Sequence, residues 1–232
     1  MSIPRALPIA LSRLRARVFV ALAAFLSQPA GRRNPAAGAD PSSLSGVLRH
    51  GDVLLTEGHT RAAALVKRVT RSSWSHVCMY VGPLEDGPDP RCIVEADIQA
   101  GIRAIRLSQL EVVKLRVLRP VDLDDGERCR LARWVVGRIG GEYDLRHAWL
   151  LAVGRLTAPL RSAAPPAAGG LAEGAAGFIC STLLAHAFAL VGHSIPAARA
   201  PARDAADHRY VVPGDFEWAS GFEIVGAPAN LG

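Results

Sequence analysis

A cysteine at the start of an apolar helix is the residue in this chain best suited to chemistry. Cys180 follows a loop that contains Gly177, and no Gly or Pro interrupts the mainly apolar run from there to Gly192. A cysteine in the first turn of a helix has its thiolate stabilised by unpaired backbone N–H groups and by the positive end of the helix dipole. Cys180 is therefore a candidate nucleophile. Cysteine is also among the most frequently buried residues, so a core thiol is the alternative until a base is identified.

A nucleophilic cysteine needs a base within hydrogen-bond reach and a third group that orients this base. Among the seven histidines, His76 lies in a segment rich in β-branched and aromatic residues, which is typical of a strand. A strand is rigid and holds an imidazole in a fixed geometry. His186 lies on the Cys180 helix six positions later and is expected to face away from the thiol. His193 and His208 lie among polar residues and are expected at the surface.

Glu95 is the best candidate for the orienting group. It lies in an otherwise apolar segment, 92–96, which is expected to pair with the His76 strand as an antiparallel hairpin. A carboxylate in such a place is costly unless another group pairs with it, and cross-strand neighbours on one face come within reach of each other. Asp97 shares the face of Glu95 and is the second choice. The long loop leaves the register open, and a solvent-exposed Glu95 at a sheet edge is the alternative.

The remaining pattern predicts a mixed α+β domain. Short runs of apolar and β-branched residues are bounded by Gly, Pro and Asp, which is typical of strands. A capping box formed by Asp124 and Glu127 marks the start of a helix, and a further apolar segment covers 147–153. Strands are expected at 53–56, 74–82, 92–96, 102–107, 112–118 and 222–225.

An amphipathic helix is expected before the His76 strand. Its apolar residues keep the i, i+3, i+4, i+7 spacing of one helix face, namely Ala62, Leu65, Val66 and Val69. The other side carries Arg61, Lys67 and Arg68 and is expected to face solvent. A loop at 157–177, rich in Ala, Pro and Gly, precedes the Cys180 helix and is expected to be exposed.

Residues 1–46 differ from the rest and are excluded from the predicted domain, which covers 47–226 and leaves a tail at 227–232. Basic residues precede an apolar run at 18–26, and small residues follow, which is the layout of a secretory signal. The run is far shorter than the ~20 residues that span a bilayer. Arg32 and Arg33 weigh against export, and a helix lying on a membrane surface or a helix packed on the domain fits about as well. Export or membrane association is slightly favoured over a cytoplasmic location.

The composition excludes some classes of function. The chain has 232 residues, 50% of them hydrophobic, and a net charge of +6. Its arginines are scattered, with few aromatic residues among them, so nucleic-acid binding is not expected. The four cysteines lack metal-ligand spacing, so neither a metal nor a cofactor is predicted. Cys78 and Cys92 are expected near one another across a hairpin, and the sequence does not decide whether they pair.

Six short motifs occur in one order along the chain and together resemble the YiiX/YebB-like proteins, the circularly permuted papain-like branch of the NlpC superfamily. The resemblance covers about 47–226. Only Ser181 and Thr182, which stand where an acidic or other polar residue often follows the cysteine, and the 157–177 insertion depart from it. The motifs are Gly51-Asp52-Val53-Leu54, Ser75-His76 to Tyr80-Val81-Gly82, Val94-Glu95-Ala96, Gly141-Glu142-Tyr143-Asp144, Phe178-Ile179-Cys180-Ser181 and Pro213-Gly214-Asp215.

This resemblance implies a permuted papain-like (NlpC-type) α+β fold, with a small antiparallel sheet packed on a central helix that bears the cysteine. By matching positions, Cys180 would be the nucleophile, His76 the general base and Glu95 the orienting residue. Tyr143 would line the substrate pocket. The order of histidine, acid and cysteine is the permuted one, and geometry rather than chain order defines such a site.

The activity that the resemblance implies is that of an amidase or peptidase. Such an enzyme cleaves an amide bond of a small peptide or amino-acid conjugate through a thioester, without a cofactor. The related lecithin retinol acyltransferase group shares the permuted layout, so a thiol acyltransferase or lipid hydrolase is the second hypothesis. A binding domain without turnover is the third. The basic, apolar arm would favour access to a membrane surface.

Overall fold

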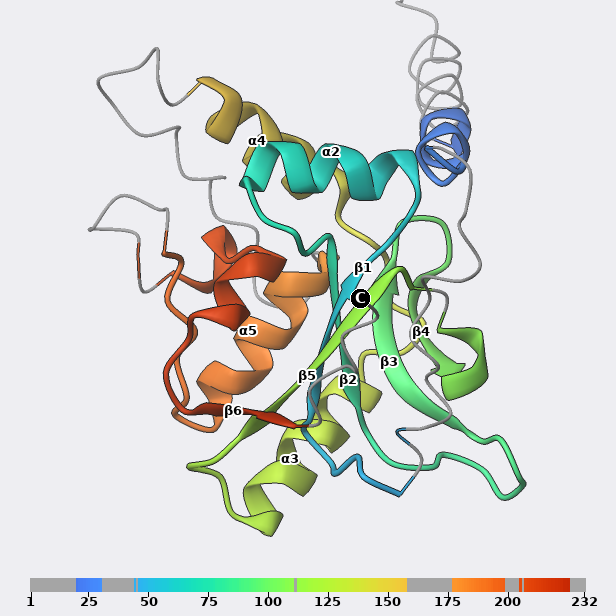
Figure 1. Cartoon of the computed structure of the whole chain (residues 1–232), viewed down its shortest axis with the longest axis vertical. Helices are drawn as coiled ribbons and strands as arrows, with labels where there is room; N and C mark the ends of the chain where they lie inside the picture. Colours follow the sequence, from blue (N-terminus) through green and yellow to red (C-terminus); the bar gives the residue numbers. More distant parts are fainter. Residues whose placement is uncertain are drawn as a thin grey trace, which may run out of the picture.

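An antiparallel sheet runs through the centre of the computed structural model (Figure 1), which describes residues 20–30, 44, 46–110, 112–157, 177–198, 205 and 207–225. Six strands within these residues form the sheet in the order β4-β3-β2-β1-β5-β6. The expected hairpin between β2 and β3 and the expected last edge strand, β6, are confirmed. The strands are β1 (Val53–Glu57), β2 (His76–Tyr80), β3 (Arg91–Asp97), β4 (Gly101–Arg106), β5 (Lys114–Pro120) and β6 (Phe222–Val225).

Helices flank the sheet and also cover one of its ends. The predicted capping box is confirmed, because the Asp124 side chain accepts a hydrogen bond from the Glu127 N–H and the Glu127 carboxylate accepts one from the Asp124 N–H. Most of the predicted 157–177 loop lies outside the described residues. The helices are α2 (Arg61–Thr70), α3 (Asp125–Val136), α4 (Leu145–Thr157) and α5 (Cys180–Leu190), with 3-10 turns η3 (Leu107–Gln109), η6 (His208–Tyr210) and η7 (Pro213–Glu217).

The main core lies between one face of the sheet and helices α5 and α3. Helix α5 is apolar almost all round, and Leu183, Leu184 and Phe188 on it are fully buried. They pack with sheet residues such as Val77 and Met79. Burying each such side chain stabilises the fold by about 1.5–3 kcal/mol. The sequence prediction of an antiparallel sheet packed on the cysteine-bearing helix, in a mixed α+β fold, is therefore confirmed.

The opposite face of the sheet forms a smaller core that connecting segments cover. Leu54, Cys78 and Ile93 point to this side and pack against residues around η3 and against Leu48. Cys78 and Cys92 are both buried free thiols, so they do not form the disulfide that the sequence left open. His76 and Glu95 lie on this same face, two residues from Cys78 and Ile93 along their strands. Ile105 and Leu110 of the smaller core also line the cavity described below.

The Gly51-Asp52 motif has a structural role. Asp52 is fully buried and accepts hydrogen bonds from Arg119 Nε at 2.9 Å and Nη2 at 2.7 Å, and from the Arg49 N–H at 2.9 Å. Gly51 has a φ of +82° and a Cβ there would meet the Leu131 side chain at 3.3 Å, so glycine suits this turn. The motif thus fixes the entry into β1 through a paired buried carboxylate.

Helices α2 and α4 contact each other at the top of Figure 1, beyond the end of the sheet. Residues 20–26 form a further helix beside α2, so the alternative of a helix packed on the domain is the one that the structure has for this part of the arm. Backbone hydrogen bonds join this segment to the start of α2, from Arg61 N–H to Gln28 O at 2.9 Å and from Ala30 N–H to His59 O at 2.8 Å. The Arg61 guanidinium also bonds to Gln28 Oε1 at 2.9 Å and lies 4.1 Å from the centre of the Phe25 ring. Residues 20–30 therefore pack on the domain, while 1–19 and 31–43 lie outside the described residues.

Among the described residues, no helix combines the length and the apolar character needed to cross a bilayer.

Candidate active site

The chain turns sharply into α5 directly before the candidate nucleophile. Ile179 is extended, with φ −91° and ψ 163°, and the Thr182 hydroxyl accepts a hydrogen bond from its N–H at 3.2 Å. Ahead of it, Phe178 N–H bonds to Glu142 O at 3.2 Å, and a Cβ on Gly177 would lie only 2.5 Å from that same oxygen. The close approach of these two segments therefore requires glycine at 177. Cys180 is consequently fixed in the first turn of α5, as predicted.

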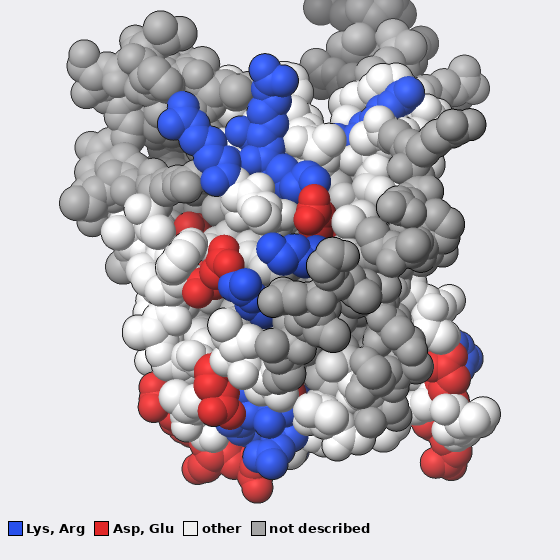
Figure 2. Space-filling view, in the orientation of Figure 1, with Lys and Arg blue, Asp and Glu red and all other residues white. Residues whose placement is uncertain are grey.

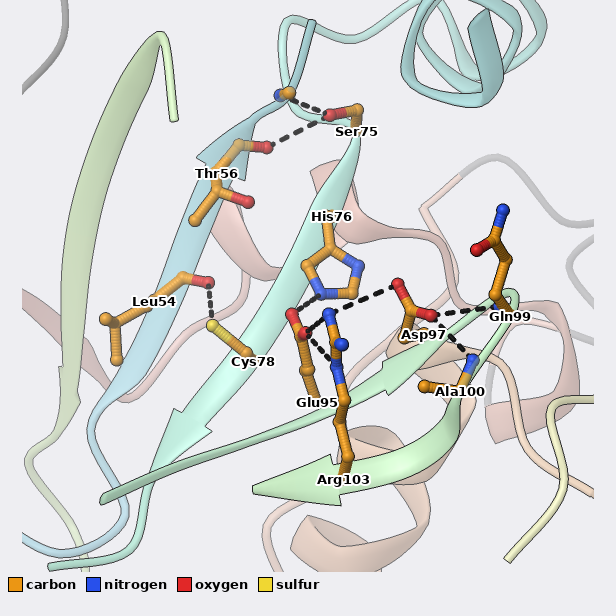
Figure 3. Close-up of polar contacts among 11 residues, drawn as sticks. Leu54, Thr56, Ser75, His76, Cys78, Glu95, Asp97, Gln99, Ala100 and Arg103 are labelled. Carbon is orange, nitrogen blue, oxygen red and sulfur yellow. Dashed lines mark hydrogen bonds and ion pairs between the residues drawn. The ribbon is translucent and has the colours of Figure 1, made fainter. Parts of the chain in front are cut away.

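His76 begins β2 at the end of the sheet that faces the start of α5. The preceding residue, Ser75, is buried, accepts a hydrogen bond from Gly58 N–H at 2.8 Å and donates one to Thr56 O at 3.3 Å. On the other side, Thr56 of β1 pairs with His76. These contacts hold the histidine backbone (Figure 3), so the ring position is set by a rigid element.

Glu95 lies beside His76, as the sequence predicted. The β2–β3 pairing aligns Met79 with Val94, and continuing this register sets Glu95 diagonally next to His76 on the same face. The ring Nε2 lies 3.1 Å from Glu95 Oε2 (Figure 3). Because Glu95 engages Nε2, Nδ1 is the ring nitrogen left for the thiol. The alternative of a solvent-exposed Glu95 is wrong, because its side chain is 10% exposed.

The thiol of Cys180 and the ring of His76 form a coupled pair. Burial raises the pKa of Cys180, but the charge and hydrogen bond of His76, with the backbone N–H groups of Val77 and Ser181, lower it below its ordinary value. Burial lowers the pKa of His76, but the Cys180 thiolate and Glu95 raise it well above its ordinary value. The opposite shifts favour a thiolate beside an imidazolium, which is the reactive form of a cysteine nucleophile.

Arg103 belongs to the same cluster and was missed from the sequence. Its Nε lies 2.9 Å and its Nη2 2.8 Å from Glu95 Oε1 (Figure 3). Burial raises the pKa of Glu95, yet hydrogen bonds and charges from His76 and Arg103 lower it from 4.5 to about 2. Glu95 therefore stays charged and orients the imidazole. The tight β3–β4 hairpin pairs Asp97 with Gly101, and the same register places Arg103 opposite Glu95. The spacing of these residues about the turn is the sequence signal that could have identified Arg103.

Asp97, the second choice for the orienting group, has another role in this geometry. Its Oδ1 accepts hydrogen bonds from Gln99 N–H at 2.9 Å and Ala100 N–H at 2.7 Å, which closes the β3–β4 turn. Its other oxygen lies 3.5 Å from Arg103 Nη2. Glu95, not Asp97, contacts the histidine.

A cavity of about 850 Å³ opens over this cluster, and Cys180, His76, Glu95 and Arg103 line it. Tyr143 also lines it, as the resemblance implied. Burial, followed by the negative charges of Cys180, Asp97 and Asp144, raises the Tyr143 pKa, so its phenol stays neutral. The side chain of His76 is 26% exposed, and a ligand in the cavity can contact this exposed part. Reactive groups and a space for a ligand therefore coincide.

Of the other histidines, His59 also lines the cavity, whereas His186, His193 and His208 do not. His186 stacks on Trp134 with ring centres 5.1 Å apart and lies 3.2 Å from His208 Nε2. His193 packs against Phe188 and Phe222 at ring-centre distances of 5.5 and 5.1 Å. His193 and His208 lie only partly at the surface, because Phe188 and Phe222 pack against His193 and the ring of His186 packs against His208.

Comparisons with known proteins give a likeness in fold. No family model matches the chain, and no curated protein matches it. A crystal structure of the metalloprotein YiiX from Escherichia coli O157:H7 superposes with a TM-score of 0.51 and 16% identity, over 77% of this chain and 96% of that chain. The chain thus has a YiiX-like fold. Within the described residues, no group of three His, Cys, Asp or Glu side chains is placed to hold a metal ion.

Proposed function

We propose that this protein is a cysteine-dependent hydrolase that cleaves an amide bond of a small peptide or amino-acid conjugate. The observation that carries the proposal is the chain of contacts from the Cys180 thiol to His76 and from His76 to Glu95 at the floor of a cavity. The YiiX-like fold is consistent with a permuted papain-like arrangement, in which the histidine and the acid precede the cysteine.

The first half of the reaction is acylation. The Cys180 thiolate attacks the amide carbonyl carbon, and the carbonyl oxygen becomes negative. The Cys180 backbone N–H, which has no partner within the helix in the first turn, is suited to donate a hydrogen bond to that oxygen. The imidazolium of His76 then gives its proton to the amide nitrogen, the C–N bond breaks, and the amine leaves a thioester on Sγ.

The second half is deacylation. His76, now neutral, removes a proton from a water molecule that attacks the thioester carbon, and the carboxylic acid leaves as the thiolate and the imidazolium are restored. Glu95 holds the ring and stabilises its positive charge at both stages. General base catalysis contributes typically about 10²–10⁴-fold to the rate, so loss of the ring is expected to remove most turnover.

A second candidate is a thiol acyltransferase or lipid hydrolase, in which the same thioester forms from a lipid or passes to another acceptor. The specific observation that favours it is the apolar character of the cavity wall formed by α2 and α4. The nature of the leaving group and of the acceptor distinguishes the two candidates, whereas the roles of Cys180, His76 and Glu95 are common to both.

The test is turnover by the full chain and by Cys180→Ala, His76→Ala and Ser194→Ala, the last as a control at an exposed position. A panel of N-acyl amino acids and acyl esters is offered, and amine, alcohol and carboxylic acid products are quantified by mass spectrometry. We expect amide cleavage that both site variants lose and the control retains. Equal turnover in Cys180→Ala would refute the nucleophile, and the absence of turnover and of a Cys180 adduct on every substrate would favour a binding domain.

A further inference from the structure

Helix α2 carries an apolar face that the other described residues cover only in part. The i, i+3, i+4, i+7 stripe predicts a face packed in the core, yet the buried residues of this helix are Ala63 and Thr70. Ala62, Val66 and Val69 of the stripe line the cavity instead. Apolar side chains that surround an open space, rather than other side chains, indicate a surface whose partner is a ligand.

Helix α4 supplies the facing wall. Ala148, Leu151 and Ala152 line the same cavity, and so do Leu22 and Leu26 of the helix at 20–26. Three helices from distant parts of the chain thus enclose one apolar space. Its volume of about 850 Å³ lies within the ~300–1,000 Å³ range of small-molecule sites.

The side of the cavity formed by the sheet brings ionisable groups together, beside the apolar Ala96 and Ile105. His76, Glu95 and Arg103 lie there, and Cys180 is reached from the same space. A ligand that satisfies both sides is amphiphilic, with a reactive polar group at the thiol and an apolar part between the helices. A peptide with polar side chains would leave its hydrogen-bonding groups unpaired against α2 and α4.

We propose that the apolar part is a long aliphatic acyl chain, so that the substrate class is N-long-chain-acyl amino acids. This inference rests on the proposed function. The carbonyl carbon of the acyl group lies at Cys180 Sγ, and the aliphatic acyl chain lies between α2 and α4. The 20–26 helix covers the acyl chain. Attack forms the acyl thioester, the amino acid leaves with the proton from His76, and water then releases the long-chain carboxylic acid.

The charge around this end of the molecule complements such a substrate. Figure 2 shows Lys and Arg side chains gathered over the end where α2 and α4 lie in Figure 1. Arg61, Arg68 and Arg146 belong to these two helices. Positive potential at the entrance attracts the carboxylate of an N-acyl amino acid and raises its rate of association.

Binding is tested apart from chemistry with Cys180→Ala. Calorimetric titration with N-dodecanoylglycine and N-acetylglycine is expected to give a Kd at least about 100-fold lower for the dodecanoyl compound, because each buried methylene contributes. Equal affinities, or no binding of the dodecanoyl compound, overturn the proposal. Turnover by the wild type is then measured over N-acylglycines with acyl chains from acetyl to hexadecanoyl, and the expected kcat/KM rises steeply with chain length.

Substitutions at two alanines of α2 test where the acyl chain of the substrate binds. Ala62 lines the cavity and Ala64 is exposed outside it. We expect Ala62→Trp to lower the ratio of dodecanoyl to acetyl kcat/KM by at least about tenfold, and Ala148→Trp on α4 to do the same. Ala64→Trp should leave the ratio unchanged, and an equal fall in Ala64→Trp contradicts the location.

The two proposals fail in different ways. Equal turnover of acetylglycine and dodecanoylglycine leaves the hydrolase standing and refutes the long-chain substrate. Tight binding of dodecanoylglycine to Cys180→Ala, without any turnover or thioester in the wild type, leaves the acyl-chain cavity standing and refutes the hydrolase. A Cys180 adduct that contains a short acyl group, formed from a substrate whose leaving group holds the long chain, refutes the proposed orientation.

Discussion

Helices α5 and α2 both present apolar side chains near the candidate site, but they use them differently. Leu183, Leu184 and Phe188 of α5 are fully buried in protein, whereas Leu65 of α2 is 38% exposed and Val66 lines the cavity. Close packing holds α5, and therefore the Cys180 thiol, in one position. The apolar face of α2, which the described residues cover only in part, borders the cavity. The same apolar chemistry thus provides rigidity on one side of the thiol and binding on the other.

Truncation of one side chain on each helix is the strongest test of this difference. Phe188→Ala is expected to lower the free energy of unfolding by about 3–5 kcal/mol, because it removes a fully buried ring. Val66→Ala should cost about 1 kcal/mol or less, because the side chain already borders an open space. Denaturant unfolding measures both. Similar losses in the two variants would mean that α2 belongs to the core.

The charge of Glu95 gives the site a pH dependence that the apolar wall lacks. Because folding lowers the pKa of Glu95 from 4.5 to about 2, its contribution to stability is fully present above pH 4.5. The contribution is lost as the pH falls towards 2, up to about 3 kcal/mol. Between pH 2 and 6, the free energy of unfolding should rise less steeply with pH in Glu95→Gln than in the wild type. An identical slope in the variant and the wild type would refute the buried charge.

Arg103 is expected to contribute a smaller effect than Glu95. Its side chain is 46% exposed, so its ion pair with Glu95 is partly screened by water. We expect Arg103→Met to lower kcat/KM by about tenfold, which corresponds to about 1.4 kcal/mol, and Arg103→Lys to restore part of it. Removing a nearby positive charge raises the pKa of His76, so the basic limb of the pH–rate profile should move to higher pH.

The control for Arg103 is Arg91→Met. Arg91 pairs with Glu85 on the surface at 2.6 Å and does not line the cavity. It should retain the activity and the pH profile of the wild type. A shift of the profile in both variants, or in neither, would remove Arg103 from the positioning role.

The sequence was most informative where local chemistry decides the structure. The Gly177 loop, the start of the Cys180 helix, and the pairing of an apolar strand containing Glu95 with the His76 strand all follow from short-range patterns, and the described residues have these features. Arg103 was also within reach, since a tight turn at Asp97 and Gly101 fixes its partner.

Short-range sequence patterns could not predict the helical wall of the cavity. The periodicity of α2 says that one face is apolar, but not whether protein or a ligand covers it. That depends on α4 and on the 20–26 helix, which lie far from α2 in sequence or belong to an arm excluded from the domain. The partly buried position of His193 likewise depends on its contact with Phe222, which lies far from it in sequence. Long-range packing, not propensity, decides these features.

The reactivity of Cys180 as a function of pH tests the central claim most directly. Iodoacetamide alkylation is followed by peptide mass spectrometry in the wild type and in His76→Ala, with the exposed Cys129 as a check on the reagent. We expect Cys180 in the wild type to react with a midpoint well below the ~8.5 of an ordinary thiol. The midpoint in His76→Ala should lie above it, because burial, the largest influence on this pKa, is then opposed only by the backbone N–H groups of Val77 and Ser181. A wild-type midpoint at or above the ordinary value, unchanged in His76→Ala, would contradict the thiolate–imidazolium pair.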